Sequence, residues 1–394
     1  MKKSKPTLTL LAGPAGCGKT HLSTEAFEEA LTHSENPLAD DLLFILPTAE
    51  HRARVIDLAL RGSLPGFFQR RITTFDRALK EFLKLGGFDF ATDVTRRLVL
   101  KEILSQSEFR YFKEAAAQGG FLDVLSKMIV ELKEYLIVPA EFQKRLSGLK
   151  ARFPEFAPKY DDLSDLYEAY EAALKRRGLI DQRDSLRLLE EGLERGEFAD
   201  PDLKNVWIDG FSDFSKLQLS FIEFLTRHAD QVTVTLAVDE NPLRRPLFQI
   251  VSETQNALED MGFRTKWLNE KNYRAQNEAL AHLERNLFCG TPVIAGQRTD
   301  GAIQIFEATG LLGEIEMIAR EIKRLVREYQ YNFSDIALLF RATDPYVRVI
   351  QSVFRKFRIP VEIHERLRLR ASPVARTLVS FFKVFSCFTQ FVLL

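Results

Sequence analysis

Short apolar runs alternate with amphipathic stretches of helical periodicity over about the first 90 residues. The runs at 7–12 and 41–46 predict buried strands, and 71–75 predicts a third, shorter one. Between them, 19–31 repeats its apolar side chains at helical spacing, and a further helix is expected up to about Leu60. Strands that are separated by helices predict a parallel sheet.

The pattern changes between residues 91 and 198. Charged, amphipathic segments follow one another there with almost no β-branched runs, which predicts an all-helical insertion. Strand-like runs return at 205–209 and 231–238, on either side of a helix expected at 217–228. We therefore expect the second half of the same sheet after the insertion.

A loop-rich stretch at 289–301 is typical of a linker, and a second α/β unit is expected after it. Its strands are predicted at 302–308, 335–340 and 360–363, and its helices at 313–328 and 346–357. Two α/β units in one chain suggest two related lobes.

Charge and composition narrow the class of protein. The 394 residues include 55 Lys or Arg and 55 Asp or Glu, which argues against a uniformly basic nucleic-acid coat protein but not against a local basic patch. A hydrophobic content of 45% with 32 Phe predicts large apolar cores and excludes long-range disorder. The cysteines, Cys17, Cys289 and Cys387, have neither metal-ligand nor disulfide-framework spacing, so we expect a reducing, cytoplasmic location.

We expect neither a leader nor a membrane span at the ends of the chain. The apolar run before Leu11 is too short for a leader, and the run from Phe381 to Leu394 is too short for a bilayer and contains Lys383. Because the second run stops without a turn or a polar tail, we expect a truncated piece of a longer chain.

One segment matches a phosphate-binding loop, GxxxxGKT, between a predicted strand and a predicted helix. Its residues are Gly13, Pro14, Ala15, Gly16, Cys17, Gly18, Lys19 and Thr20. In such a loop the backbone N–H groups face the phosphates, the lysine reaches the β- and γ-phosphates, and the threonine hydroxyl binds Mg²⁺. ATP and Mg²⁺ are therefore the expected ligands, and a chance glycine-rich turn is the alternative. Cys17 is expected to be a small filler and not a nucleophile.

A phosphate-binding loop also needs an acidic residue at the end of a nearby apolar strand, which holds Mg²⁺ through water. Asp209, which follows Val206-Trp207-Ile208, is the best candidate. A helix cap or a turn residue is the alternative for this aspartate.

The residues after Asp209 resemble UvrD-type superfamily 1 helicases, whose corresponding motif reads Asp-Glu-x-Gln-Asp. Asp209 and Asp213 match its first and last positions. Gly210 stands where the family has the Glu that polarises the attacking water. The resemblance therefore implies slow ATP hydrolysis by this chain alone, with Asp213 as the alternative base.

Other positions resemble the same family more loosely. Thr48 resembles a residue that touches single-stranded DNA, and Thr74 and Phe75 resemble the segment after it, with strand or core roles as the alternative. Arg341 ends a predicted strand and resembles the arginine that reaches the γ-phosphate in that family. A solvated strand-end arginine is its alternative.

The loop together with Trp207 to Phe214 resembles one branch more closely, the B subunit of AddAB-type ATP-dependent helicase–nucleases. The resemblance implies an α/β fold with a RecA-like P-loop lobe, an all-helical insertion, and an incomplete second RecA-like lobe. The implied domains are the first lobe at 1–90 and 199–295, the helical insertion at 91–198, the start of the second lobe at 296–365, and the start of a second helical insertion at 366–394.

The function that the resemblance implies is that of an ATP-binding subunit. It would belong to a helicase–nuclease complex acting on DNA ends in double-strand-break repair and recombination, with an A-type subunit as heterodimer partner and no membrane. The family's nuclease domain and its cysteine-bound iron–sulfur cluster are not expected in this fragment. An autonomous DNA helicase and, from another class, a P-loop kinase are the alternatives; Gly210 argues against the first, and the helical insertion and Arg341 against the second.

The charge is unevenly distributed near the end of the chain. From Arg341 to Lys383 there are ten Lys or Arg against three Asp or Glu. This excess predicts a path for DNA. A solvated helix face, or a surface that pairs with further chain, is an equally good interpretation.

Overall fold

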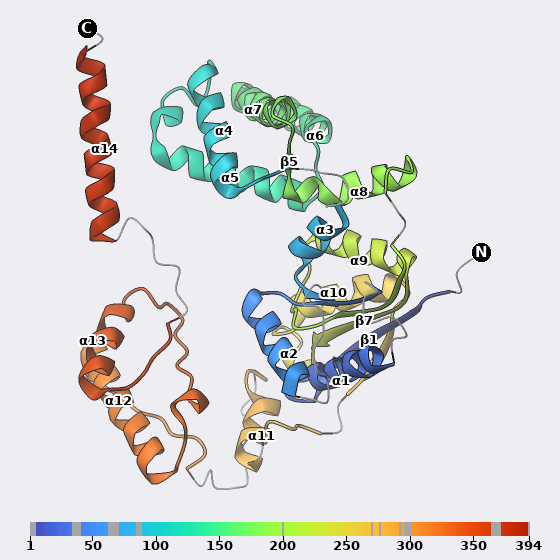
Figure 1. Cartoon of the computed structure of the whole chain (residues 1–394), viewed down its shortest axis with the longest axis vertical. Helices are drawn as coiled ribbons and strands as arrows, with labels where there is room; N and C mark the ends of the chain where they lie inside the picture. Colours follow the sequence, from blue (N-terminus) through green and yellow to red (C-terminus); the bar gives the residue numbers. More distant parts are fainter. Residues whose placement is uncertain are drawn as a thin grey trace. The chain divides into compact units, whose positions relative to one another are not determined.

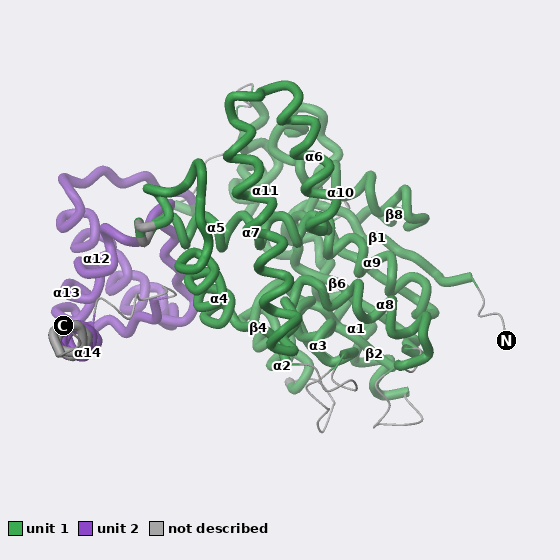
Figure 2. The backbone as a smooth tube through the Cα atoms, turned by 90° about the horizontal axis from the view of Figure 1, so that it is seen from above, with its two compact units in different colours: residues 1–302 green, residues 303–394 purple. Residues whose placement is uncertain are grey.

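The computed structural model describes most of the chain. The described residues are 5–33, 41–61, 71–83, 89–198, 201–268, 271–275, 277–290, 294, 301–363 and 372–392. The chain divides into two compact units, residues 1–302 and residues 303–394 (Figure 2).

A six-stranded sheet forms the centre of unit 1 (Figure 1). Its strands are β1 (Thr7–Gly13), β2 (Leu42–Ile45), β3 (Ile72–Thr73), β6 (Leu203–Ile208), β7 (Ala229–Ala237) and β8 (Arg264–Trp267). The order is β3-β2-β6-β7-β1-β8, and each neighbouring pair runs parallel. The fold of unit 1 is therefore α/β, as the alternation of strands and helices predicted.

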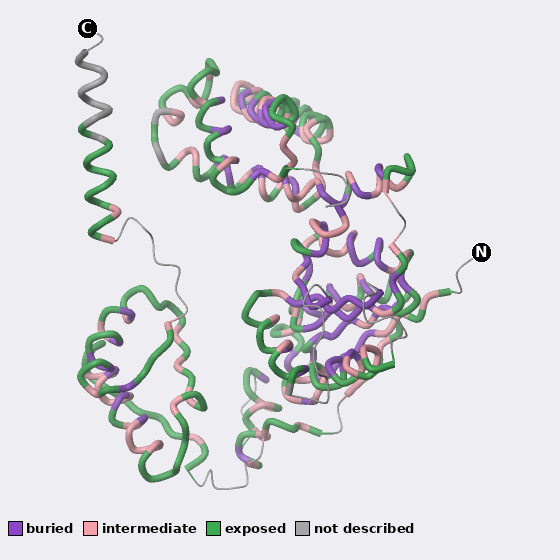
Figure 3. The backbone as a smooth tube through the Cα atoms, viewed as in Figure 1, coloured by how far each residue is buried: buried purple, intermediate pink, exposed green. Residues whose placement is uncertain are grey.

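Helices cover both faces of this sheet, which explains why its strands read as continuous apolar runs. In β2, successive side chains point to opposite faces: Leu43 and Ile45 enter one core, and Leu42 and Phe44 enter another. The helices of unit 1 that pack on the two cores are α1 (Lys19–Thr32) and α2 (Ala49–Arg61) on one, and α3 (Phe75–Leu83), α8 (Ser185–Glu194), α9 (Lys216–His228) and α10 (Gln249–Asp260) on the other. Figure 3 shows the buried residues concentrated in the strands and on the inward sides of these helices.

Helix α9 begins where the sequence supplies a complete capping box. The Ser215 hydroxyl accepts from the Gln218 backbone N–H at 3.3 Å, and the Gln218 side chain accepts from the Ser215 N–H at 2.9 Å. These two bonds satisfy backbone donors that a helix start leaves unpaired. The turn between β6 and α9 contains the residues after Asp209, and the capping box fixes the end of this turn that enters α9.

The stretch predicted to be helical contains five α-helices and a core of its own. The helices are α4 (Asp93–Gln106), α5 (Gly119–Glu134), α6 (Pro139–Arg152), α7 (Ala157–Arg176) and α8 (Ser185–Glu194). Tyr167 and Tyr170 on α7 are almost fully buried in the core that joins α4, α5 and α7. A short parallel pair that the sequence analysis missed, β4 (Asp89–Ala91) with β5 (Leu179–Asp181), brings the start of this stretch beside the segment between α7 and α8.

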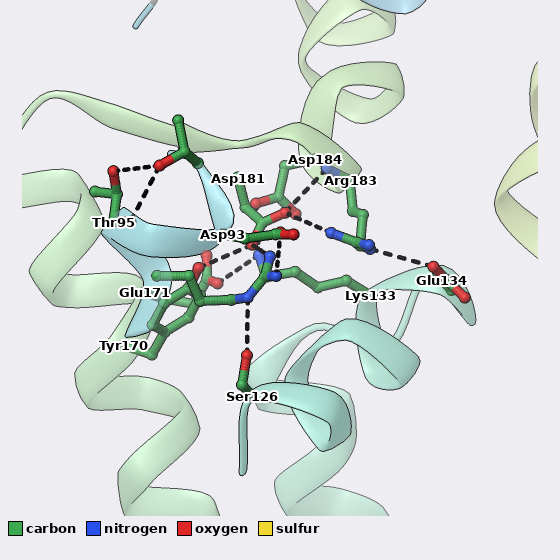
Figure 4. Close-up of polar contacts among 12 residues, drawn as sticks. Asp93, Thr95, Ser126, Lys133, Glu134, Tyr170, Glu171, Asp181, Arg183 and Asp184 are labelled. Carbon is green, nitrogen blue, oxygen red and sulfur yellow. Dashed lines mark hydrogen bonds and ion pairs between the residues drawn. The ribbon is translucent and has the colours of Figure 1, made fainter. Parts of the chain in front are cut away.

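A network of charged groups lies inside this helical stretch (Figure 4). The Lys133 side chain is 2% exposed, and its Nζ lies 2.5 Å from both Glu171 Oε1 and Asp184 Oδ2. Tyr170 donates its hydroxyl to Asp181 at 2.8 Å. The network therefore ties α5, α7 and the segment around β5 to one another through buried polar contacts.

One further α-helix and several 3₁₀ turns complete the described secondary structure; the last of these turns, η7, lies in unit 2 and the others lie in unit 1. Helix α11 (Glu278–Asn286) follows β8. The 3₁₀ turns are η3 (Ala115–Ala117), η4 (Pro154–Phe156), η5 (Gln182–Asp184), η6 (Pro242–Arg244) and η7 (Phe333–Asp335).

Unit 2 contains the helices that were predicted but not the strands. Its helices are α12 (Gly310–Glu328), α13 (Val347–Phe357) and α14 (Pro373–Val392). The predicted strands at 302–308, 335–340 and 360–363 are wrong, because none of these described segments pairs with a neighbour as a strand.

The reason for the wrong strands is visible in the side chains. Ile336, Leu338 and Phe340 pack against α12 and α13, whereas Leu339 is 95% exposed. This is the alternation of a strand with one covered face, but a strand also requires backbone hydrogen bonds to a neighbour. The alternation thus correctly predicted which side chains are covered. It wrongly predicted a strand, because no neighbouring strand pairs with this segment among the described residues.

Helix α14 carries exposed apolar side chains. Leu378, Phe381 and Phe382 are 52%, 56% and 66% exposed. In the part of the chain that the structure describes, we find no helix with both the length and the apolar character that a membrane span requires.

Candidate functional site

A cleft of about 780 Å³ opens at the edge of the unit 1 sheet where the parallel strands end. Ligand sites of α/β proteins are commonly found at this edge. The cleft receives side chains from the loop after β1, from α1 and α2, from the ends of β6 and β7, and from the segment after β8. The predicted site residues that line it are Ala15, Gly16, Gly18, Lys19, Thr20, Asp209 and Gly210.

The loop between β1 and α1 presents the start of a helix to this cleft. Helix α1 begins at Lys19, directly after Gly18, so its first backbone N–H groups face outward from the loop. Lys19 Nζ donates to the carbonyl oxygens of Gly13 at 2.7 Å and Pro14 at 2.8 Å. A helix N-terminus with a lysine held over it attracts anions, and phosphate above all.

Cys17 fills space under this loop. It is 5% exposed, and its Sγ lies 3.3 Å from Lys19 Nζ. A Cβ atom added to Gly13 would lie 2.8 Å from that sulfur and 2.6 Å from the Leu268 carbonyl oxygen. The Cys17 side chain is therefore buried beneath its own loop and packs closely against Gly13, as expected for a filler residue.

Asp209 is held in place by two hydroxyl groups. Its carboxylate is nearly buried, and it accepts from Thr20 Oγ1 at 2.9 Å and from Thr235 Oγ1 at 2.5 Å. Thr20 lies in α1, Asp209 directly follows β6, and Thr235 lies in β7. The register of the parallel strands β6 and β7 brings these three side chains together. A hydroxyl beside a carboxylate is an oxygen-only donor set, which suits Mg²⁺ with its remaining positions filled by water and phosphate.

Gly210 adopts a backbone conformation that side chains rarely tolerate. Its φ is 86°, and an added Cβ would lie 3.3 Å from Cδ of Pro47. A carboxylate at this position would therefore require the backbone to change. Asp213 is exposed, and its Oδ1 accepts from Ser212 Oγ at 2.9 Å. The acidic residues that line the cleft, among those described, are Glu25, Glu28 and Asp209.

A segment that the sequence analysis missed lies across the glycine-rich loop. The Tyr273 backbone N–H donates to the Gly16 carbonyl at 2.8 Å, and Asn272 Nδ2 donates to the Ala15 carbonyl at 3.3 Å. A Cβ on Gly16 would lie only 2.4 Å from Asn272 Oδ1, so this close approach requires a glycine. Tyr273 and Arg274 line the cleft, where they add an aromatic ring and a positive charge to Phe211, Lys19 and Arg54.

The signal for this segment lies in β8, which was not predicted. Strand β8 pairs in parallel with β1, so the residues after each of them reach the same edge of the sheet. The four residues of β8 read Arg-Thr-Lys-Trp and contain no apolar run. Recognising them as a strand would have placed Asn272, Tyr273 and Arg274 beside the glycine-rich loop.

The other predicted site residues lie elsewhere. Thr48 is exposed, and its Oγ1 accepts from the His51 N–H at 3.3 Å, at the start of α2. Phe75 is 5% exposed and packs on Phe211 at 5.1 Å between ring centroids. Phe75 therefore packs in the core of unit 1, which favours the core alternative over contact with DNA. For Thr48 and Thr74 contact with DNA stays a prediction.

Arg341 belongs to unit 2, where it is exposed. Its predicted approach to a γ-phosphate stays a prediction. Among the described residues, the arginines that line the cleft with Lys19 are Arg54 and Arg274, both in unit 1.

The sheet and the cleft define an α/β protein whose first parallel strand is joined by a glycine-rich loop to a helix that opens onto the site. The chain belongs to the family described as "ADDB, N-terminal", whose model matches residues 10–284. The matched span contains the glycine-rich loop, Asp209, Tyr273 and Arg274. The family resemblance inferred from the sequence is thereby confirmed.

Two proteins that are similar in sequence to this chain share one name. A protein of Desulforudis audaxviator, named as the B subunit of an ATP-dependent helicase/deoxyribonuclease, is 31% identical over 393 residues, which cover 95% of this chain. A protein of the same name from Geobacillus kaustophilus is 29% identical over 390 residues and covers 93% of it. The chain spans 33% of the length of each of these relatives.

Proposed function

We propose that this chain binds ATP with Mg²⁺ in the cleft of unit 1 and acts as the ATP-binding subunit of a helicase–nuclease complex. The observation that carries the proposal is the meeting of Lys19, Thr20 and Asp209 at the start of α1. A cation, a hydroxyl and a carboxylate at a helix N-terminus are the groups that a triphosphate with Mg²⁺ requires. Unit 1 would then be the P-loop lobe of a RecA-like pair.

Each group in the cleft has a distinct task in this proposal. Backbone N–H groups at the start of α1 and the Lys19 ammonium bind the phosphates, once Lys19 releases the carbonyl oxygens of Gly13 and Pro14. Thr20 and Asp209 hold Mg²⁺, which would neutralise phosphate charge. The exposed ring of Tyr273 offers a face for the base, and Arg274 offers a further positive charge for the phosphates.

Hydrolysis is expected to be slow. The position after Asp209 is a glycine with positive φ, and Asp213 is turned toward Ser212. Loss of a positioned general base typically lowers the rate by about 10²–10⁴-fold. The proposed role is therefore nucleotide binding more than motor force.

The name of the relatives is the basis for proposing a complex, a partner subunit and a DNA substrate. The B subunit of a helicase/deoxyribonuclease implies a partner subunit, here proposed as the A-type helicase–nuclease subunit in a heterodimer, and DNA as the substrate. We extend this to DNA ends in double-strand-break repair and recombination, with a location in the cytoplasm.

Calorimetric titration of the full chain with ATP and Mg²⁺ tests the nucleotide site. Lys19→Ala should weaken binding by about tenfold or more, because a charge-assisted hydrogen bond to phosphate contributes about 1.5–3 kcal/mol. Lys101→Ala removes an exposed lysine on α4 and is the matched control. Equal affinity of the wild type and Lys19→Ala would refute the site.

Two assays separate the alternatives. ATP turnover of tens per second that DNA stimulates would favour an autonomous helicase. Transfer of the γ-phosphate to a small acceptor, without DNA binding, would favour a kinase.

A further inference from the structure

Unit 2 carries a hollow of about 550 Å³ whose lining is almost entirely basic. The cations come from the second half of α12 and from the end of α13. We call these six residues the basic stripe: Arg320, Lys323, Arg324, Arg327, Lys356 and Arg358.

The spacing of the residues on α12 places them on one face. Positions 320, 323, 324 and 327 follow the i, i+3, i+4, i+7 pattern of a single helix face. The neighbouring face, with Ile315, Ala319 and Ile322, is buried against Ile350 and Val353 of α13. The apolar face therefore anchors α12 and fixes where the basic stripe lies.

Carboxylates neutralise only part of this charge. Glu316 lies 3.2 Å from Arg320 and 3.4 Å from Lys356. Arg324 pairs with Glu321 at 2.5 Å and Glu328 at 3.5 Å.

The other three cations, Lys323, Arg327 and Arg358, have no ion pair among the described residues. The basic stripe therefore has an excess of positive charge that an anionic partner would balance.

A structural role at the helix ends does not account for all of these residues. Cations in the last turn of a helix interact favourably with its dipole, which explains Arg327. Arg358 is different, because it follows α13 in the left-handed conformation, at φ 53° and ψ 45°. Glycine or asparagine is preferred at that position. The stability of the helix end alone would therefore favour a smaller residue than arginine.

We propose that the basic stripe binds the phosphodiester backbone of DNA, an inference that rests on the proposed role of the chain in a DNA-processing complex. Guanidinium groups match phosphate oxygens in bidentate geometry. From Arg320 to Arg327 the stripe runs along two turns of helix, about 10 Å. This length exceeds a single phosphate group and suits several phosphates in a row.

Salt-dependent binding of single-stranded DNA to the full chain tests the proposal. A variant with Lys323→Gln, Arg327→Gln and Arg358→Gln should bind about tenfold more weakly. The slope of log affinity against log salt should fall by about 2, since each phosphate contact with a single strand contributes about 0.7.

The matched control is Lys101→Gln, Lys127→Gln and Lys144→Gln, which removes the same charge from exposed lysines in the helical insertion. Its affinity should stay within about twofold of the wild type. Equal losses in the two triple variants would attribute binding to net charge and overturn the proposal.

A single substitution separates binding from folding. Arg358→Gly removes the guanidinium and supplies the residue that the left-handed position prefers. The thermal midpoint should rise or stay unchanged, while the affinity for DNA falls by about two- to fivefold. An unchanged affinity for DNA would overturn the role of Arg358 at the stripe.

The failure of this inference can be told apart from the failure of the proposed function. If the wild type binds DNA and the stripe variants bind it equally, the stripe proposal fails and the proposed function stands. If inorganic phosphate binds the stripe but DNA affinity does not depend on it, the site is one for small anions and the proposal is overturned. If the wild type binds ATP but no DNA at low salt, the proposed role on DNA fails together with the stripe.

Discussion

The Asp209 carboxylate has been taken almost entirely out of water, and the Thr235 hydroxyl is one of the two groups that compensate it. Thr235→Val keeps the shape of the side chain and removes this hydrogen bond. Affinity for ATP in the presence of Mg²⁺ should fall by about fivefold or more, because the carboxylate is no longer oriented, and an unsatisfied buried oxygen costs about 1–3 kcal/mol. Affinity measured without Mg²⁺ should change little.

Thr233→Val is the matched control for this substitution. Thr233 lies two residues earlier on β7, on the same side of the strand, and is half-buried. If both variants lose Mg²⁺-dependent affinity equally, the effect comes from the strand and not from the contact with Asp209.

The conformation of Gly210 predicts the effect of a side chain there. Gly210→Ala should destabilise the protein by about 1–2 kcal/mol, because a Cβ disfavours a φ of 86°. Gly148→Ala is the control, since Gly148 lies within helix α6 with nothing within 4 Å of an added Cβ, and it should be neutral or stabilising. Urea denaturation measures both. If Gly210→Ala has the same free energy of unfolding as the wild type, the backbone at this position does not require a glycine.

At the scale of elements, the buried network predicts how firmly the helical insertion is held. Lys133→Met leaves Glu171 and Asp184 without their shared cation and should cost about 3–5 kcal/mol. Hydrogen exchange of amides in α5 and α7 should accelerate accordingly. Lys144→Met, at an exposed position on α6, is the control and should leave exchange unchanged.

The same network predicts a loss of stability at alkaline pH. Burial and the nearby Asp181 raise the pKa of Tyr170, and burial and Glu171 raise the pKa of Tyr167. Burial alone would lower the pKa of Lys133, but Asp184 and Glu171 outweigh it and raise the value.

A group whose pKa is higher in the folded state stabilises below its unfolded pKa and loses that contribution as the pH rises toward the folded value. The contribution of these two tyrosines and Lys133 to stability should therefore be flat up to pH 10.0, the ordinary pKa of tyrosine, and fall above it. Each group contributes about 1.4 kcal/mol per pH unit. Urea midpoints on both sides of that pH measure the fall, which should be shallower in Tyr170→Phe. A midpoint that is constant to about pH 11.5 would contradict the prediction.

The elements also explain which parts of the fold the sequence could predict. Strands β1, β2, β6 and β7 are apolar because both of their faces are covered, and all four were predicted. The missed β8 is short and carries two cations. Ile336, Leu338 and Phe340 have the alternation of a strand but no partner among the described residues, so local pattern overpredicted the sheet there.

The site follows the same rule. The glycine-rich loop, Lys19 and Thr20 form a local motif, and Asp209 follows an apolar strand that the sequence reveals. Tyr273 and Arg274 reach the cleft only because β8 pairs with β1. Their position depends on strand pairing between distant parts of the chain, which no local pattern encodes. Phe75 was open between two roles until its burial placed it in the core.

At the scale of the whole molecule, the two units have separate cores. Unit 1 encloses the sheet and the helical insertion, and unit 2 packs α12 against α13 around Ile350 and Phe354. The candidate nucleotide cleft belongs to the first unit and the basic stripe to the second. The variants proposed for each can therefore be measured independently on one chain.

The strand order has a consequence for how the chain is made on the ribosome. Ile45 of β2 pairs with Ile208 of β6, and Leu10 of β1 pairs with Val234 of β7. At roughly 5–20 residues per second, synthesis would reach these partners only after about 10–40 s. During that interval the first strands have unsatisfied backbone edges, while the helical insertion between them can already fold. The nascent first half is thus the stage at which a chaperone would matter most.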